Sequence, residues 1–135
     1  ASLLAEKHWL NVEDDWPFAD GAFDVVVAAE LLEHLWRPET VVVKAWKALR
    51  PGGLFIGSIP NGYNWRHVVR RMPQSPDHKK RYRYSDLVHP GTMLLGCFAQ
   101  REVVPIGTIK GRALPVWVMR IVPALAETWC FRCTK

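Results

Sequence analysis

The chain has 135 residues, of which 49% are hydrophobic and 23% are charged, and its net charge is +5. This composition is typical of a folded globular protein and argues against a disordered one. No apolar run approaches the ~20 residues of a membrane-spanning helix, and the start shows no basic leader followed by an apolar stretch. Three cysteines, an odd number, do not indicate a disulfide framework. We therefore expect at most one domain in a reducing, cytoplasmic setting.

Charge is distributed unevenly along the chain. Residues 1–65 hold five Lys and Arg against nine Asp and Glu, whereas residues 66–83 hold seven basic residues against Asp77 alone. A basic segment of this kind is either a solvated loop or a surface that meets something anionic. The sequence leaves both interpretations open.

The first predicted elements form a strand–helix–strand unit. Residues 7–13 predict a weak strand, followed by a turn-rich connection with Pro17 and Asp20-Gly21. Residues 25–29, VVVAA, lack polar alternation and predict a strand buried on both faces, as in a parallel sheet.

A helix is predicted from Pro38, which suits a first helical turn because its missing N–H needs no partner there. Its apolar stripe has helical spacing and comprises Val42, Ala45, Trp46 and Leu49. Pro51-Gly52-Gly53 should end this helix before a second buried strand over residues 54–59. Short turns on both sides predict a right-handed βαβ unit.

The remaining elements are less regular. Ser85-Asp86 predicts the start of a short helix that Pro90-Gly91 interrupts. Residues 102–106 and 128–134 predict strands. Between them, LPVWVMRIVPAL (114–125) predicts an apolar, helical segment.

Three stretches carry a family resemblance: WPFADGAFDVVVAAELLEHLWRPE (16–39), ALRPGGLFIGSIPN (48–61) and the weaker LLGCFAQREVV (94–104). In combination they resemble class I S-adenosylmethionine-dependent methyltransferases, in the broad branch that includes ubiquinone and menaquinone biosynthesis. The resemblance implies an α/β fold with a Rossmann-like sheet, and S-adenosyl-L-methionine lying across the carboxyl ends of its strands. It also implies methyl transfer to a small-molecule or lipid-like acceptor in the full-length enzyme.

Part of the family pattern has no counterpart in these residues. The family's first strand, its glycine-rich turn and the acidic residue that ends its second strand are missing. Since the family's strand order is 3-2-1-4-5-7-6, the strand at 25–29 should then become an exposed edge. We expect residues 1–135 to form a single partial domain, truncated at the N-terminus. Alone, it should bind the cofactor weakly or not at all and be inactive.

The resemblance also implies which residues meet the cofactor. The backbone around Ala29, Glu30 and Leu31, just after the buried strand, should approach the methionine part. An acidic residue that follows the third strand should meet the adenine amino group, and Glu13 and Asp14 are the two candidates.

Glu30, Glu33 and His34 form a polar group directly after the strand, with three readings: a metal site, pocket-lining groups, or solvent-facing residues. Glu-x-x-Glu-His lacks the first histidine of a zinc signature, and no second Glu-x-x-His element exists, so no metal site is predicted. His34 is the candidate catalytic base because its reference pKa is near neutral. Methyl transfer from a sulfonium depends largely on positioning, however, and does not require a base.

Residues 62–84 are a basic connection with interleaved aromatic residues. In the resembled family this region covers the substrate, so we expect a substrate-side lid, with Asn61, Tyr63, His78 and Arg81 as substrate-binding residues. An anionic small molecule is favoured over nucleic acid as its partner. Contact with anionic lipid head groups is a further hypothesis, because the apolar segment 114–125 accompanies this charge.

Two other function classes stay open. One is a non-catalytic, truncated module that binds an anionic partner through the basic 66–83 face. The other is a nicotinamide-binding oxidoreductase, which the missing glycine fingerprint disfavours. Cys130 and Cys133 have CxxC spacing, but residues three apart in a strand point to opposite faces, so neither a disulfide nor a shared metal is expected.

Overall fold

The computed structural model describes residues 7–69, 75–89, 92, 94–109 and 112–135. Its centre is a four-stranded sheet in the order β1-β2-β6-β3. β1 (Phe23–Ala29) runs parallel to β2 (Leu49–Pro60), and β6 (Thr128–Thr134) runs antiparallel to both β2 and β3 (Gln100–Ile106). This order equals the 4-5-7-6 part of the family's sheet, as the resemblance implies.

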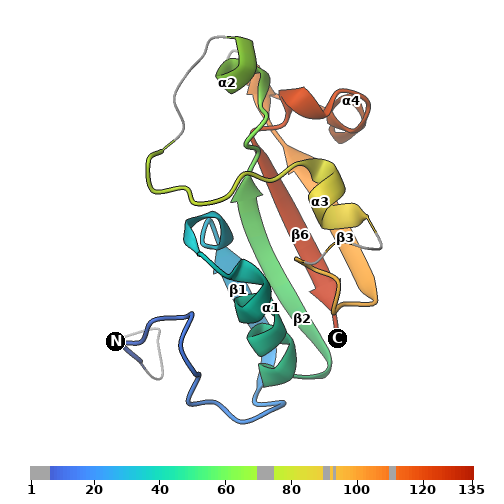
Figure 1. Ribbon diagram of the computed structural model, residues 1–135. Helices are drawn as coiled ribbons and strands as arrows, with labels where there is room; N and C mark the ends of the chain where they lie inside the picture. Colours follow the sequence, from blue (N-terminus) through green and yellow to red (C-terminus); the bar gives the residue numbers. More distant parts are fainter. Residues whose placement is uncertain (1–6, 70–74, 90–91, 93, 110–111) are drawn as a thin grey trace, which may run out of the picture.

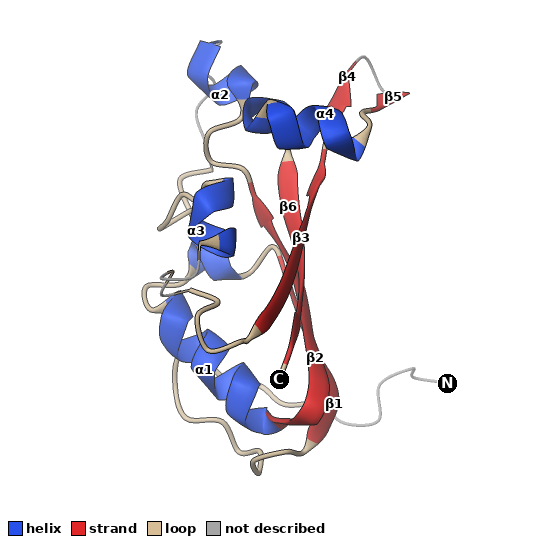
Figure 2. Ribbon diagram, turned by 90° about the vertical axis from the view of Figure 1, so that its right-hand side faces the viewer, coloured by secondary structure: helices blue, strands red, loops and turns tan. Residues whose placement is uncertain are grey.

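Helices cover one side of this sheet. α1 (Pro38–Ala48) connects β1 to β2, and with α3 (Tyr84–Val88) it lies on the same side (Figure 2). The short α2 (Trp65–Val69) and α4 (Val116–Ile121) lie beyond one end of the sheet (Figure 1). The two-stranded β4 (Thr108–Ile109) and β5 (Arg112–Ala113) lie at the same end (Figure 2). Two 3-10 turns, Leu32–His34 and Pro123–Leu125, complete the elements. No helix in the described part of the chain is long and apolar enough to span a bilayer.

The core lies between α1, α3 and the covered face of the sheet. The buried α1 residues Val42 and Ala45 follow the predicted stripe, and burying them removes apolar surface from water. Phe55 of β2 stacks on Phe98, with ring centroids 5.5 Å apart, and also contacts Phe131 of β6. The strand–helix–strand order, the two later strands and the short helix ending before Pro90 are confirmed.

The prediction that residues 25–29 are buried on both faces is wrong. Val27 is 66% exposed and Val25 is 43% exposed, while Ala28 on the opposite face is buried. The reason is that β1 pairs with β2 alone among the described strands, and its outer face carries no helix there. The exposed edge expected from the family's strand order is therefore present.

Three smaller expectations also need correction. Residues 7–13 form no strand; the chain turns, with the Asp14 N–H donating to the Asn11 carbonyl. The helix ends at Ala48, so Pro51-Gly52-Gly53 belongs to β2, where Gly52 (φ 76°) donates its N–H to the C-terminal Lys135. Trp46 is half-buried, because its ring packs under the Lys135 ammonium, 4.4 Å from the centroid.

Candidate functional site

The chain leaves β1 through a residue with an unusual backbone conformation. Glu30 has φ 48°, the left-handed region that side-chain-bearing residues adopt uncommonly. Its N–H donates at 3.0 Å to the carbonyl of Ser58, which is the last paired β2 residue of the parallel β1–β2 ladder. The turn sends the chain away from the sheet and leaves Ala29 and Glu30 exposed and Leu31 half-buried. The three residues predicted to meet the cofactor thus lie together at the carboxyl end of β1.

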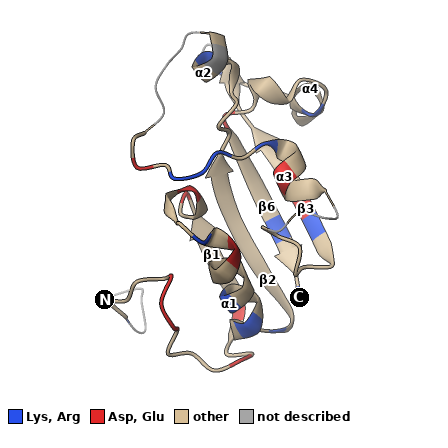
Figure 3. Cartoon of the chain, viewed as in Figure 1, with Lys and Arg blue, Asp and Glu red and all other residues tan. Residues whose placement is uncertain are grey.

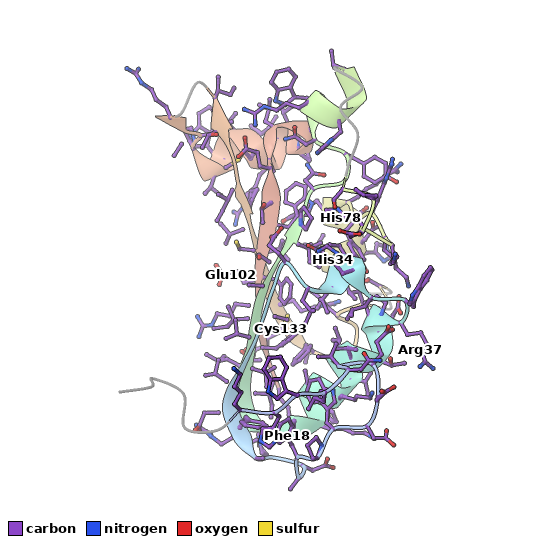
Figure 4. The ribbon with its side chains drawn as sticks, turned by 90° about the vertical axis from the view of Figure 1, so that its left-hand side faces the viewer. Phe18, His34, Arg37, His78, Glu102 and Cys133 are labelled. Carbon is purple, nitrogen blue, oxygen red and sulfur yellow. The ribbon has the colours of Figure 1, made fainter. Side chains whose placement is uncertain are left out.

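The following 3-10 turn brings together a group that we name the carboxylate–histidine cluster: Glu33, His34 and His78. Glu33 Oε1 lies 3.7 Å from His34 Nε2, and the two imidazole rings meet edge to face with centroids 4.9 Å apart (Figure 4). One potential ligand atom from each residue lies within 4.8 Å of the other two. The cluster joins two segments that are distant in sequence.

Backbone hydrogen bonds hold the second segment in place. The Glu33 carbonyl accepts the N–H groups of Lys79 at 2.7 Å and Lys80 at 3.2 Å. Asn61 and Tyr82 then form a parallel β-bridge next to the end of β2. His78 is thereby fixed beside His34, which the sequence did not predict as a contact.

Burial sets the electrostatics of the cluster. It raises the pKa of the Glu33 carboxyl above its ordinary value, and the nearby charge of Glu30 adds to this effect. For His78, burial lowers the pKa of the imidazole, and the neighbouring His34 lowers it further. Without a bound cation, the cluster therefore favours the protonated, neutral form of Glu33 and the neutral form of His78.

The candidates for adenine recognition lie in the loop before β1, against the first turns of α1. Glu13 Oε1 accepts the Arg37 N–H at 2.6 Å, and the Glu13 carbonyl accepts a hydrogen bond from Lys44 Nζ at 2.7 Å. Asp14 contributes its carbonyl to the same ammonium group. These contacts fasten the loop 13–16 to α1, and the part of both residues in cofactor binding stays a prediction.

A pocket of about 320 Å³ lies at the end of β2. Its wall is mostly aromatic and apolar, and its rim carries Arg83, whose guanidinium lies 4.3 Å from the centroid of the Tyr63 ring. The lining residues are Asn61, Tyr63, Arg83, Tyr84, Ser85, Pro123, Ala124 and Trp129. Sequence reasoning did not select Tyr84 or Trp129, since Trp129 is an ordinary inward-facing residue of a strand pattern.

Asn61 proves to be a structural residue as well as a pocket residue. It is buried, and its side-chain amide donates to the carbonyls of Pro123 at 3.0 Å and Ala126 at 2.9 Å. Its oxygen accepts the Tyr63 N–H at 3.0 Å. Of the other predicted substrate residues, Tyr63 lines this pocket, whereas His78 belongs to the cluster. Arg81 lines a neighbouring, more open pocket.

Several basic residues of the 66–83 segment have partners within the chain. Lys80 pairs with Glu39 at 2.9 Å, Arg66 pairs with Glu127, and Lys79 lies 5.1 Å from the centroid of the Trp36 ring. Arg70 and Arg71 lie outside the described residues. Figure 3 shows the basic residues before α3 close to acidic ones of α1 and α3. Because these basic side chains already have partners within the chain, the alternative of a non-catalytic module that binds an anion through the 66–83 segment is not favoured.

Comparison with known proteins finds similarity to methyltransferases. The family described as "Methyltransferase domain" matches residues 6–57. "Probable S-adenosylmethionine-dependent methyltransferase" of Mycolicibacterium smegmatis is 35% identical over 71 residues, which are 53% of this chain and 27% of that protein. The ubiquinone biosynthesis O-methyltransferase of Escherichia coli is 31% identical over 71 residues, covering 46% of this chain and 30% of that protein. These matches support a class I S-adenosylmethionine-dependent methyltransferase.

Solved structures agree on the fold of this chain. A methyltransferase from Thermotoga maritima superposes with a TM-score of 0.65 at 16% identity, over 90% of this chain and 60% of that one. Another from Archaeoglobus fulgidus gives 0.60 at 14% identity, over 87% and 62%. The Rossmann-like α/β fold and the family's cofactor, S-adenosyl-L-methionine, are as the resemblance implied. The chain spans less than a third of the length of the curated relatives it matches.

Proposed function

We propose that this chain forms the methionine-side and acceptor-side walls of an S-adenosylmethionine-dependent methyltransferase that acts on a small molecule. The observation that carries the proposal is the Glu30 turn, which presents the backbone of Ala29–Leu31 at the carboxyl end of β1. Ligands of open α/β sheets bind at this edge. The cluster and the pocket at the end of β2 lie along the same edge, beside the carboxyl ends of the two parallel strands.

The reaction would be an in-line displacement. A lone pair of the acceptor attacks the methyl carbon while its bond to sulfur breaks, and S-adenosylhomocysteine leaves uncharged at sulfur. Bringing the two reactants into line accounts for most of the acceleration in such a step. For a hydroxyl acceptor, His34 Nε2 would take the released proton as long as no metal ion occupies that nitrogen, with Nδ1 held 3.3 Å from the Asp77 carbonyl.

The lining of the pocket supports an apolar acceptor with an anionic group. Tyr63, Tyr84 and Trp129 provide flat apolar surfaces, and Arg83 provides a charged donor at the rim. Next to the pocket, α4 and the residue after it expose Trp117, Ile121 and Val122 to solvent. This apolar surface supports a lipid-like acceptor reached at a membrane surface.

Cofactor binding can be tested by titrating S-adenosylmethionine into the isotopically labelled 135-residue chain and following its amide NMR signals. We expect weak binding, with shifts centred on residues 28–31, because this chain supplies only part of the cleft. ATP, which shares the adenosine but lacks the methionine, should leave these signals nearly unchanged. If the cofactor shifts signals elsewhere in the chain but none near Ala29, the proposed methionine-side wall is wrong.

The acceptor class can be tested by vesicle co-sedimentation. The chain should pellet with anionic phosphatidylglycerol vesicles more than with phosphatidylcholine vesicles, and Trp117→Ser should weaken this. Trp36→Ser is the matched control, because Trp36 is similarly exposed but lies beside α1. Pelleting that is independent of both lipid charge and Trp117 would leave only a water-soluble acceptor.

A further inference from the structure

The most unusual buried group in the described part of the chain is the Glu33 side chain. It is 1% exposed, and neither carboxylate oxygen has a hydrogen-bond partner among the described residues. An ionised carboxylate without a partner is costly to bury, so such a group is either protonated or neutralised by a cation. His34 Nε2 lies 3.7 Å from Glu33 Oε1, which is too far for a hydrogen bond.

The orientation of His34 matches that of a metal ligand. Its Nδ1 lies 3.3 Å from the Asp77 carbonyl oxygen, an acceptor, so Nδ1 carries the proton in this contact. The lone pair is then on Nε2, the atom that faces Glu33. Metal-binding histidines commonly donate their other ring N–H to a backbone carbonyl in this way, which fixes both the tautomer and the ring.

His78 completes a set of three ligands. The potential ligand atoms of Glu33, His34 and His78 all lie within 4.8 Å of one another. With metal–ligand distances of about 2.0–2.2 Å, tetrahedral ligand atoms lie roughly 3.3–3.5 Å apart. Both imidazoles are half-buried, so modest rotations of their side chains can close the difference, while the backbone bonds from Lys79 and Lys80 to Glu33 keep the two segments together.

We propose that Glu33, His34 and His78 bind a first-row divalent metal ion of the zinc class. Two imidazoles and one carboxylate are the donors that such ions take, whereas Mg²⁺ and Ca²⁺ favour sets made of oxygen atoms. Three protein ligands leave a coordination position open to water. Glu30, on the exposed turn directly after β1, adds negative potential beside Glu33, which favours a cation there.

The proposed site differs from the expectation that the sequence motif holds no metal. Glu-x-x-Glu-His alone offers too few ligands in one local segment, and the missing ligand is supplied by the connection after β2. The proposal does not rest on the proposed function, because metal binding is measured here without cofactor or acceptor. Metal binding with no methyl transfer, or the reverse, would separate the two.

The test is titration of the untagged, EDTA-treated chain with Co²⁺, followed by competition with Zn²⁺. We expect one Co²⁺ per chain with visible absorption bands that Zn²⁺ abolishes, and a higher Tm in Zn²⁺. His78→Gln and Glu33→Gln should each raise the Kd by roughly ten-fold or more. His89→Gln, a surface histidine outside the cluster, is the matched control and should bind as the unmodified chain does.

Circular dichroism without metal checks that the variants fold. Glu33→Gln should fold at least as well as the unmodified chain, because it removes a buried ionisable group, so its loss of Co²⁺ binding reports on the site. Metal binding that is absent, or equal in the unmodified chain and both variants, would overturn the proposal. A metal-independent loss of Tm in His34→Gln without Co²⁺ bands would instead indicate a simple His34–Glu33 ion pair and would also overturn it.

Discussion

Gly57 of β2 faces Phe131 of β6 so closely that a Cβ on the glycine would lie 2.4 Å from Phe131 Cζ. The same Cβ would lie 2.3 Å from the carbonyl oxygen of Ala28 in β1. The absence of a side chain at this position therefore lets three strands approach one another under the core. It also explains why a glycine, which weakens most strands, occurs inside this one.

We predict that Gly57→Ala destabilises the chain by at least about 2 kcal/mol, because the new methyl group overlaps both backbone and ring atoms. Urea unfolding followed by circular dichroism measures this. Val27→Ala, at an exposed position of the neighbouring strand, is the control and should change stability by well under 1 kcal/mol. Equal stability of Gly57→Ala and the unmodified chain would contradict the packing at the β2–β6 pair.

Asn61 should act as a structural anchor between β2 and the turn after α4. Asn61→Ala removes the donors to the Pro123 and Ala126 carbonyls, and we expect a loss of about 2–3 kcal/mol in the free energy of unfolding. Asn61→Asp keeps the acceptor for the Tyr63 N–H but loses both donors, so it should not restore stability. Asn11→Ala, at an exposed turn, is the control, and a comparable loss there would argue against the anchor.

Glu33 should make stability depend on pH when no metal is present. Since burial raises its folded-state pKa above 4.5, the folded chain retains a proton that the unfolded chain loses. The stabilising effect of that proton is complete below pH 4.5 and is lost as the pH rises through the raised pKa. In EDTA, the Tm of the unmodified chain should therefore fall relative to that of Glu33→Gln between acidic and neutral pH. Parallel Tm profiles for the two proteins would show that Glu33 titrates normally.

The thiols of β6 should be inert and unable to pair. Cys133 lies on the buried face, where burial raises the pKa of its thiol to about 12, while Cys130 lies on the other face. We expect a thiol reagent at mildly alkaline pH to leave Cys133 unmodified in the folded chain and to label it after unfolding. Mass spectrometry of oxidised, folded protein should show no Cys130–Cys133 disulfide, and Cys130→Ser should leave the protection of Cys133 unchanged.

Much of the fold could be predicted because its signals are local. The apolar run after Asp24, Pro38 at a first helical turn and the alternating residues of 128–134 each report a backbone conformation through their own spacing. The weak strand predicted at residues 7–13 failed because a strand needs a neighbouring strand, and none of the described ones lies beside it. The spacing of apolar residues and the helix-capping signals do not say which strands lie side by side.

The candidate site was predictable only in part for the same reason. The position of Ala29–Leu31 follows from the strand end and the family motifs, which lie in one continuous stretch. The contacts of His78 with His34, and of Asn61 with Ala126, cross long stretches of chain and depend on where the connections return.

By itself, the sequence determined the strand–helix–strand unit, the later strands and the resemblance to methyltransferases, because periodic apolar residues and contiguous motifs encode them locally. The tertiary structure alone decided that β1 has one open face, that the basic segment is partly paired within the chain, and that Glu33 is buried beside two histidines. Burial and charge compensation depend on neighbours distant in sequence, and only the folded chain brings those neighbours together.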